Sequence, residues 1–353
     1  MKTIVCCLLI MLSYSGISQI RLDTLFKNAG ITGVQIKYTK NGKSFNYCYG
    51  IAREGETKKI TTSSVFQAAS LSKPVLAYIT MKMADKKILH LDTALYYYYK
   101  YDRIKKDSAA QRITARMVLH HLSGLPNWAT NPVSKQWATS ELQTKISPGK
   151  QWSYSGEGFM FLQLVLEKLL QQSLETIAKN EVFIPLQMRS SSFLWNSSFE
   201  NTGVYGHNNI GEVTGRNEFF LPAGAYSLLT TATDYSLFVQ ALISGKGLSK
   251  QSNQLLAGDI VSVAKNEADT IAAAKHIFWG LGYGIQQNEK NKTIWHWGDN
   301  GDFKCFFIAN PVTKESLVYF TNSEKGLKVM QSVLNYFFGI QNWYASQWLD
   351  VAF

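Results

Sequence analysis

Residues 66–77 read FQAASLSKPVLA, and within this stretch Ser70 and Lys73 stand three positions apart. On a helix, positions i and i+3 share a face with Cβ atoms roughly 5–6 Å apart, so the lysine amine can sit beside the serine hydroxyl. A nucleophile and its proton acceptor need this proximity. Proline is tolerated only near a helix start, so Pro74 predicts a helix that begins near Ser70 and runs to about Lys87. The hydroxyl would then lie at the positive end of the helix dipole.

The same spacing occurs three times, at Ser70/Lys73, Ser147/Lys150 and Ser262/Lys265. The second pair encloses Pro148-Gly149, a turn signal that would keep its side chains off a common helix face. The third pair could be helical, so the spacing alone does not distinguish it from the first.

The composition is that of a globular chain, with 353 residues, 46% hydrophobic and 17% charged. This length allows one large domain or two. The net charge is +11, but the basic residues are scattered, with no run longer than a pair. Nucleic-acid binding usually requires a clustered basic patch or a known motif, so we expect no nucleic-acid partner.

Residues 1–19 have the pattern of a secretory leader, with Lys2 before an apolar run and small residues after it. The run is too short to span a bilayer and no later stretch is long enough, so we expect no integral membrane segment in the mature chain. The pattern predicts an exported protein, periplasmic or extracellular. Only Cys48 and Cys305 then remain, too few for a disulfide framework or a cysteine metal site.

Strand signals stand at the two ends of the chain and helix signals between them. Asn41-Gly42 predicts a tight hairpin between two alternating strands. His120 and His121 would end a helix pointing about 100° apart, so they cannot easily grip one metal ion. We therefore predict an α/β (α+β) fold, an antiparallel sheet built from both chain ends and flanked by helices. The single domain would span 20–353, with a sheet part at about 20–65 and 278–353 and a helical insertion at about 66–277. Late strands are expected at 279–285, 293–298, 303–308 and 316–321.

Several separated stretches together resemble the serine β-lactamase-like hydrolases, which include class C β-lactamases, DD-peptidases and related esterases. The resemblance begins with Ser70-Leu71-Ser72-Lys73, which matches the family's first motif. Tyr154-Ser155-Gly156 falls where the second motif, Tyr-x-Asn, belongs, and His296-Trp297-Gly298 falls where the family has Lys-Thr-Gly or His-x-Gly. Supporting matches are 121–126, 223–227 and 279–284.

The resemblance implies that Ser70 attacks a carbonyl and forms an acyl-enzyme, without a metal or other cofactor. Lys73 and Tyr154 would handle the Ser70 proton, and which of them is the base stays open. Backbone N–H groups of Ser70 and Asp299 would hold the oxyanion. The remaining substrate-binding residues implied by the resemblance are Gly156, His296, Trp297 and Gly298.

The sequence departs from the family pattern at two of these positions. Gly156 replaces an asparagine that in the family helps position the lysine and the substrate's amide. His296 replaces the lysine of the true class C β-lactamases in particular and would hold a carboxylate less firmly than a fixed ammonium does, while Asp299 and Asp302 close by add negative charge. The resemblance implies cleavage of an amide, ester or lactam bond, in an ester, D-amino-acyl or peptide-type substrate. The departures are more compatible with esters, neutral amides or substrates that bear an amine than with substrates that carry a carboxylate. The alternative is a penicillin-recognition or peptide-binding protein of the same fold with little turnover.

The resemblance also places Cys48 and Cys305 on strands about three positions apart. At about 4.8 Å per strand, they would be separated by well over the 7 Å or so that a disulfide allows between Cα atoms. We expect two thiols rather than a disulfide.

Overall fold

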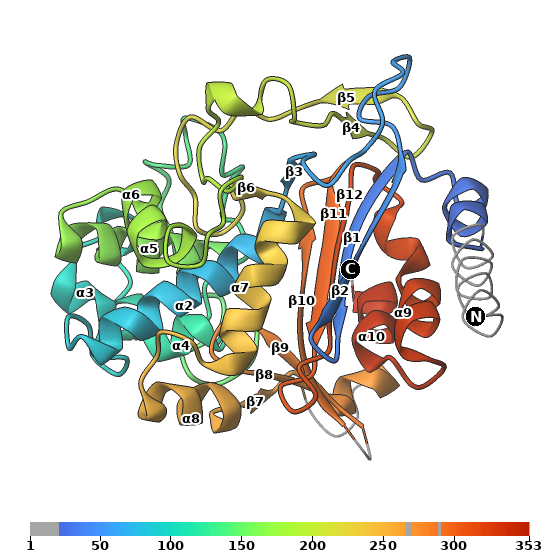
Figure 1. Cartoon of the computed structure of the whole chain (residues 1–353). Helices are drawn as coiled ribbons and strands as arrows, with labels where there is room; N and C mark the ends of the chain where they lie inside the picture. Colours follow the sequence, from blue (N-terminus) through green and yellow to red (C-terminus); the bar gives the residue numbers. More distant parts are fainter. Residues whose placement is uncertain (1–20, 266–269, 289–290, 353) are drawn as a thin grey trace, which may run out of the picture.

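The computed structural model describes residues 21–265, 270–288 and 291–352. The predicted leader, residues 1–19, lies outside them. The described part forms a central antiparallel sheet in the order β2-β1-β12-β11-β10-β9-β8-β7. Figure 1 shows helices α2, α5, α7 and α8 on one side of this sheet and α9 and α10 on the other.

The two ends of the chain meet inside the sheet. Strands β1 (Gly33–Lys40) and β2 (Lys43–Gly50) form a hairpin. Its turn residues Asn41 and Gly42 have φ values of 51° and 72°, the left-handed pair that a tight hairpin requires. On its other side β1 pairs with β12 (Ser316–Thr321), near the end of the chain. This joining of the termini confirms the predicted fold class.

The rest of the sheet differs from the sequence prediction at one point. The single strand expected over 279–285 is wrong, because the chain makes two strands, β8 (Ile277–Trp279) and β9 (Gly284–Gln287). Gly282 turns the chain between them with φ +99°. The sheet is completed by β7 (Val261–Ser262), β10 (Lys292–Asp299) and β11 (Lys304–Ala309).

Both faces of the sheet are buried, and side-chain alternation divides its residues between two cores. On β12, Val318 and Phe320 join the core that contains α2 and α5. Leu317 and Tyr319 join the opposite core, which contains α9, α10 and the helical residues 21–28. Successive side chains of a strand point to opposite faces, so an almost wholly apolar strand suits a sheet covered on both sides.

The helices on the first side carry the residues of interest. Ser155 and Thr231 cap α5 and α7 by accepting the N–H groups of Gly158 and Asp234. The helix bounds are α2 (Ser72–Asp85), α3 (Leu95–Tyr98), α4 (Ala115–Leu119), α5 (Gly156–Leu170), α6 (Leu174–Ala178), α7 (Ala232–Ser244), α8 (Lys250–Gly258), α9 (Met330–Phe338) and α10 (Tyr344–Ala352). Two short sheets pair β3 (Phe66–Gln67) with β6 (Leu229–Thr230) and β4 (Gly206–His207) with β5 (Val213–Gly215).

Helix α2 is the centre of the helical side. Its residues from Ser72 to Met81 are all buried, and it is apolar around most of its circumference, as expected of a helix enclosed by others. No helix within the described ranges is both long and apolar enough to cross a membrane.

The two cysteines are separated in the sheet as expected. Cys48 lies on β2 and Cys305 on β11, with β1 and β12 between them. Both are free thiols, and the prediction is confirmed.

Candidate active site

Ser70 lies in a 3-10 turn, Ala69–Leu71, that leads directly into α2. Ala69 has φ +45°, a left-handed conformation that is rare for alanine and that clusters at functional sites. Leu228 holds the turn from both sides: its carbonyl accepts the Ala68 N–H at 2.7 Å and its own N–H donates to Ser72 Oγ at 3.0 Å. The strained turn is thus fixed at the positive end of the helix.

Lys73 lies one turn along the helix, with Nζ 2.9 Å from Ser70 Oγ. The same Nζ donates to the carbonyl oxygen of Ala225 at 2.8 Å. The lysine is 1% exposed, and this burial lowers its pKa to about 7. A large share of the amine is therefore neutral near neutral pH, when it can accept a proton from Ser70.

Tyr154 is the third member of the cluster. Burial raises the pKa of its hydroxyl above the ordinary value, although the nearby Ser70 hydroxyl acts to lower this pKa. Lys73 Nζ lies 4.8 Å from the Tyr154 ring centroid. The ring itself is held between His121, at a centroid distance of 4.3 Å, and Trp297, at 4.8 Å. The phenol stays protonated near neutral pH, so it can donate a hydrogen bond or relay a proton.

Two buried histidines complete the surroundings of the cluster. His121 Nδ1 accepts the Ser155 N–H at 3.0 Å, and His296 Nδ1 lies 2.6 Å from the Trp297 carbonyl oxygen. Burial, with the Lys73 charge as a second cause, lowers the pKa of His296 to about 3 and that of His121 well below its usual range. Both rings are neutral at physiological pH.

Ser70 opens into a hollow of about 220 Å³. Of the predicted substrate-binding residues, Asp299 lines this hollow together with Ser70. The other four, Gly156, His296, Trp297 and Gly298, are not among the lining residues, and their substrate contacts stay predictions. The lining residues are Ser70, Asn127, Trp128, Pro132, Val133, Asn217, Phe219, Tyr226, Asp299 and Asn300.

Gly298 serves the packing of the nucleophile turn. A Cβ atom at this position would lie 2.6 Å from the Ala68 carbonyl oxygen and 2.3 Å from Cys305 Sγ. Any side chain here would push β10 away from the turn that carries Ser70. The glycine permits this close approach of strand and turn.

Gly156, where the family has asparagine, lies against an indole ring. A Cβ atom at Gly156 would be 2.5 Å from Trp128 Cζ2, so Trp128 fills the space that an asparagine side chain would need. The Gly156 N–H donates to Asn127 Oδ1 at 3.0 Å. The loop that contains Asn127 and Trp128 therefore occupies the space, and takes up the backbone N–H group, at the position where the motif has changed.

The charge of the hollow is small. Asp299 is the one lining residue that carries a formal charge at neutral pH, and its Oδ1 is paired with Lys304 Nζ at 2.5 Å. Asp302, the second acidic residue named in the sequence analysis, is not among the lining residues and accepts a hydrogen bond from Thr214. The lining offers three carboxamides and three aromatic rings but no cation.

Several of these lining residues were not predicted from the sequence. Tyr226 lies within the supporting match at 223–227, which was a usable signal. Trp128 lies two residues after the supporting match at 121–126, and Phe219 lies four residues before the one at 223–227, but nothing in the local sequence marks either residue as part of the site. The three asparagines, Asn127, Asn217 and Asn300, were likewise unmarked.

The structure separates Ser70/Lys73 from the two other pairs of the same spacing. Ser147 and Lys150 are exposed in a turn. Ser262 lies on the strand β7, so the helical alternative for this pair is wrong. Ser70 and Lys73 thus form the pair whose hydroxyl and amine meet in a buried site.

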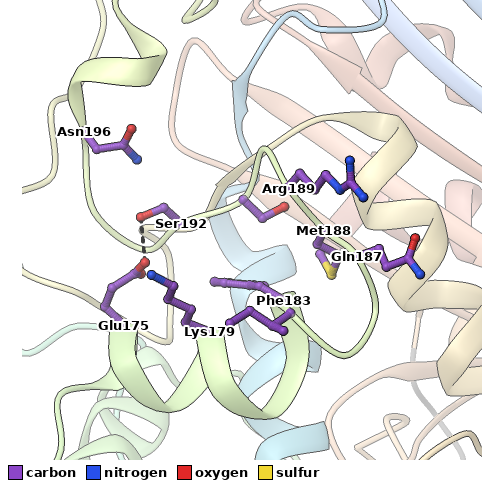
Figure 2. A pocket seen from close by; sticks show the side chains of 10 residues that line it. Glu175, Lys179, Phe183, Gln187, Met188, Arg189, Ser192 and Asn196 are labelled. Carbon is purple, nitrogen blue, oxygen red and sulfur yellow. Dashed lines mark hydrogen bonds between the residues drawn. The ribbon is translucent and has the colours of Figure 1, made fainter.

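A second and larger hollow, about 470 Å³, shares no lining residue with the first. Figure 2 shows Glu175, Lys179 and Arg189 around it. Glu175 accepts hydrogen bonds from Ser192 Oγ at 3.0 Å and from the Phe193 N–H at 2.6 Å. Its carboxylate thus ties two chain segments together, which is a structural task.

Within residues 21–265, 270–288 and 291–352, no group of three or more His, Cys, Asp or Glu side chains is placed to hold a metal ion. The adjacent histidines diverge: His120 Nε2 lies 3.0 Å from Asp259 Oδ1, while His121 faces Tyr154.

Fold and site together define a protein of the β-lactamase/DD-peptidase fold. A class C β-lactamase superposes with a TM-score of 0.75 at 20% identity, covering 91% of this chain and 95% of the other. The β-lactamase/D-alanine carboxypeptidase of Pseudomonas syringae gives a TM-score of 0.78 at 14% identity, covering 94% and 99%. At these identities the similarity shows the fold alone.

The sequence matches the family described as Beta-lactamase over residues 21–333, and the chain belongs to this family. It is 24% identical over 349 residues to penicillin-binding protein 4* of Bacillus subtilis (strain 168), covering 89% of this chain and 74% of the relative. It is also 24% identical over 330 residues to protein flp of Staphylococcus aureus (strain MRSA252), covering 86% of this chain and 63% of that protein.

Proposed function

We propose that this protein is an exported serine hydrolase in which Ser70 attacks an ester or amide carbonyl and forms an acyl-enzyme that water resolves. The observation that carries the proposal is the buried Lys73 amine 2.9 Å from Ser70 Oγ. Family membership supports the reaction class, and the leader pattern of residues 1–19 supports export.

In the acylation step, neutral Lys73 accepts the Ser70 proton as the bond from Oγ to the carbonyl carbon forms. The backbone N–H groups of Ser70 and Asp299, the two predicted oxyanion donors, take the charge that develops on the carbonyl oxygen. When the bond to the leaving group breaks, the proton passes to the leaving atom, with the Tyr154 hydroxyl as relay. Water then attacks the acyl carbonyl, and Lys73 accepts a proton from it. When the bond from Ser70 Oγ to the acyl carbon breaks, this proton passes to Ser70 Oγ and the carboxylic acid leaves.

The substrate we propose lacks a carboxylate near the scissile bond. A β-lactam and a D-alanyl peptide both carry one, and relatives with such names suggest these compounds. The lining of the hollow supplies no cation, and its one carboxylate is already paired with Lys304. A neutral ester or amide requires no such countercharge.

A second candidate is a penicillin-recognition protein with little turnover, and Gly156 is the observation that favours it. Without the second-motif side chain, one contact to the substrate's amide is missing. The intact arrangement of Ser70, Lys73 and Tyr154 favours the hydrolase, because recognition alone needs none of the three at hydrogen-bonding distance.

The test compares turnover of p-nitrophenyl butyrate and benzylpenicillin by the wild type, Ser70→Ala and the matched controls Ser147→Ala and Ser262→Ala. We expect the wild type and both controls to hydrolyse the ester and to leave penicillin unchanged, while Ser70→Ala falls to background. Ester turnover retained in Ser70→Ala would refute the proposal. A lasting penicillin adduct without ester turnover would establish the second candidate.

A further inference from the structure

Trp128 and Gly156 form one unit beside the nucleophile. The indole ring occupies the space above Gly156, with three of its atoms within 2.5–2.9 Å of where a Cβ atom would stand. Any residue other than glycine at position 156 would displace the ring. Only a glycine at position 156 therefore allows the Trp128 ring to lie where it does, in the lining of the hollow at Ser70.

The loop that carries Trp128 is fastened on both sides of it. The Asn127 carbonyl oxygen accepts the N–H groups of Gly156 and Glu157, each at 3.1 Å. On the other side, the Ala129 N–H donates to Glu157 Oε1 at 3.0 Å. Glu157 is itself fully buried and paired with the Arg103 guanidinium at 2.7 and 3.0 Å. These contacts hold the ring in one place, as a built binding surface requires.

Trp128 also belongs to an aromatic group within the hollow. Its ring meets Tyr226 edge to face at a centroid distance of 5.7 Å, and Tyr226 meets Phe219 in the same way at 5.8 Å. All three line the hollow with Ser70. Edge-to-face and stacked contacts with such rings favour a flat aromatic group. The lining has no cation for an anionic group, and its one carboxylate, Asp299, is already paired with Lys304.

We propose that Trp128, seated over Gly156, is the residue that determines specificity, and that it selects substrates whose acyl group carries a flat, uncharged ring. This inference rests on the proposed function, since the acyl group is the part that stays attached to Ser70. Where the family has a side-chain amide at position 156, this protein has the Trp128 indole ring in the lining of the hollow.

The test measures the rate at which Ser70 is labelled by two fluorophosphonates, one with a phenylalkyl group and one with a small alkyl group. The readout is the ratio of the two rates, followed by intact mass. We expect the wild type to prefer the phenylalkyl probe, and Trp128→Ala to lower the ratio about tenfold. Tyr97→Ala, which removes an aromatic side chain that is 74% exposed and outside the hollow, is the matched control and keeps the wild-type ratio.

Gly156→Ala tests the link between the two residues without altering the indole. Its Cβ displaces the ring, so it lowers the ratio as Trp128→Ala does, and the double variant shows no further loss. The inference would be overturned if the ratio of the two labelling rates were unchanged in Trp128→Ala, or if the double variant lowered this ratio by the sum of the two single effects. In either case, labelling of Ser70 would still support the proposed function. Absence of labelling by both probes would overturn both.

Discussion

Lys73 Nζ donates a hydrogen bond of 2.8 Å to the carbonyl oxygen of Ala225, from the loop that precedes β6. In the family, the asparagine of the second motif helps to position this lysine, and here that residue is Gly156. The contact with Ala225 holds the Lys73 amine in its place. A backbone carbonyl accepts from a neutral or a charged amine alike, so it positions Lys73 without fixing its charge. The amine remains 2.9 Å from Ser70 Oγ and can change protonation state there.

The pH dependence of acylation follows from Lys73. Because burial lowers its pKa to about 7, the amine is protonated and inactive as a base below that pH and neutral above it. The acylation rate should rise through pH 7 and level off above pH 8. The measurement is the burst rate with a p-nitrophenyl ester between pH 5 and 9.

Lys73→Met is the companion variant for this profile. It should fold and lose about 10²–10⁴-fold in acylation rate, the usual contribution of a general base. What rate remains should no longer depend on pH near 7. A wild-type profile that keeps rising up to pH 9 without levelling off would instead point to a base with a higher pKa, such as Tyr154.

The buried pair of Glu157 and Arg103 should be the most costly polar contact to break. Their side chains are 0% and 2% exposed, and Glu157→Gln leaves the guanidinium without its counter-ion. We expect a loss of about 3–5 kcal/mol in the free energy of unfolding, measured with urea. Glu141→Gln, which breaks the exposed pair with Lys106, is the control and should leave the unfolding midpoint unchanged. Equal effects of the two substitutions would contradict this ranking.

Gly298→Ala should impair the site through packing. The added Cβ would meet the Ala68 carbonyl oxygen at 2.6 Å, and relieving this contact separates β10 from the Ser70 turn. We expect a stability loss of about 1–3 kcal/mol and a larger relative loss of activity. Gly258→Ala is the control, since nothing lies within 4 Å of its added Cβ. Full activity in Gly298→Ala would show that the close approach is dispensable.

The two thiols should differ in reactivity. Cys305 is buried beside the Ala68 carbonyl oxygen, and burial raises its pKa well above the usual range. Ellman's reagent should leave Cys305 unmodified in the folded protein and modify both Cys48 and Cys305 in guanidinium chloride without reductant. A reductant requirement would reveal a disulfide and contradict the strand order.

Motifs with a local physical signature could be predicted from the sequence. The Asn41-Gly42 turn was found because few residues accept two left-handed positions in succession. Ser70 and Lys73 could be predicted because helical spacing brings them together and because the family resemblance distinguishes this pair from the other two of the same spacing. The turn at Gly282 could not be predicted in this way. Trp279, Leu281, Tyr283 and Ile285 stand at alternate positions, as the residues on one face of a single strand do, and this pattern conceals the reversal of the chain.

The wall of the site depends on tertiary contacts that no local pattern announces. Trp128 and Gly156 are separated by 27 residues in the sequence. From the sequence, the glycine in the second motif indicates only a missing side chain, whereas the structure shows the Trp128 indole in the space that this side chain would need. The same holds for Asn217 and Asn300, which reach the hollow from separate loops. Sequence patterns predicted the chemistry of the cluster better than the shape of the substrate pocket.

The most direct test of the central claim is the intact mass of the protein, quenched within the burst phase of p-nitrophenyl ester hydrolysis and followed by peptide mapping. The account predicts a mass increase equal to one acyl group, located on Ser70, absent in Ser70→Ala and strongly delayed in Lys73→Met. An acyl group found on another residue, or the same adduct formed by Ser70→Ala, would contradict it.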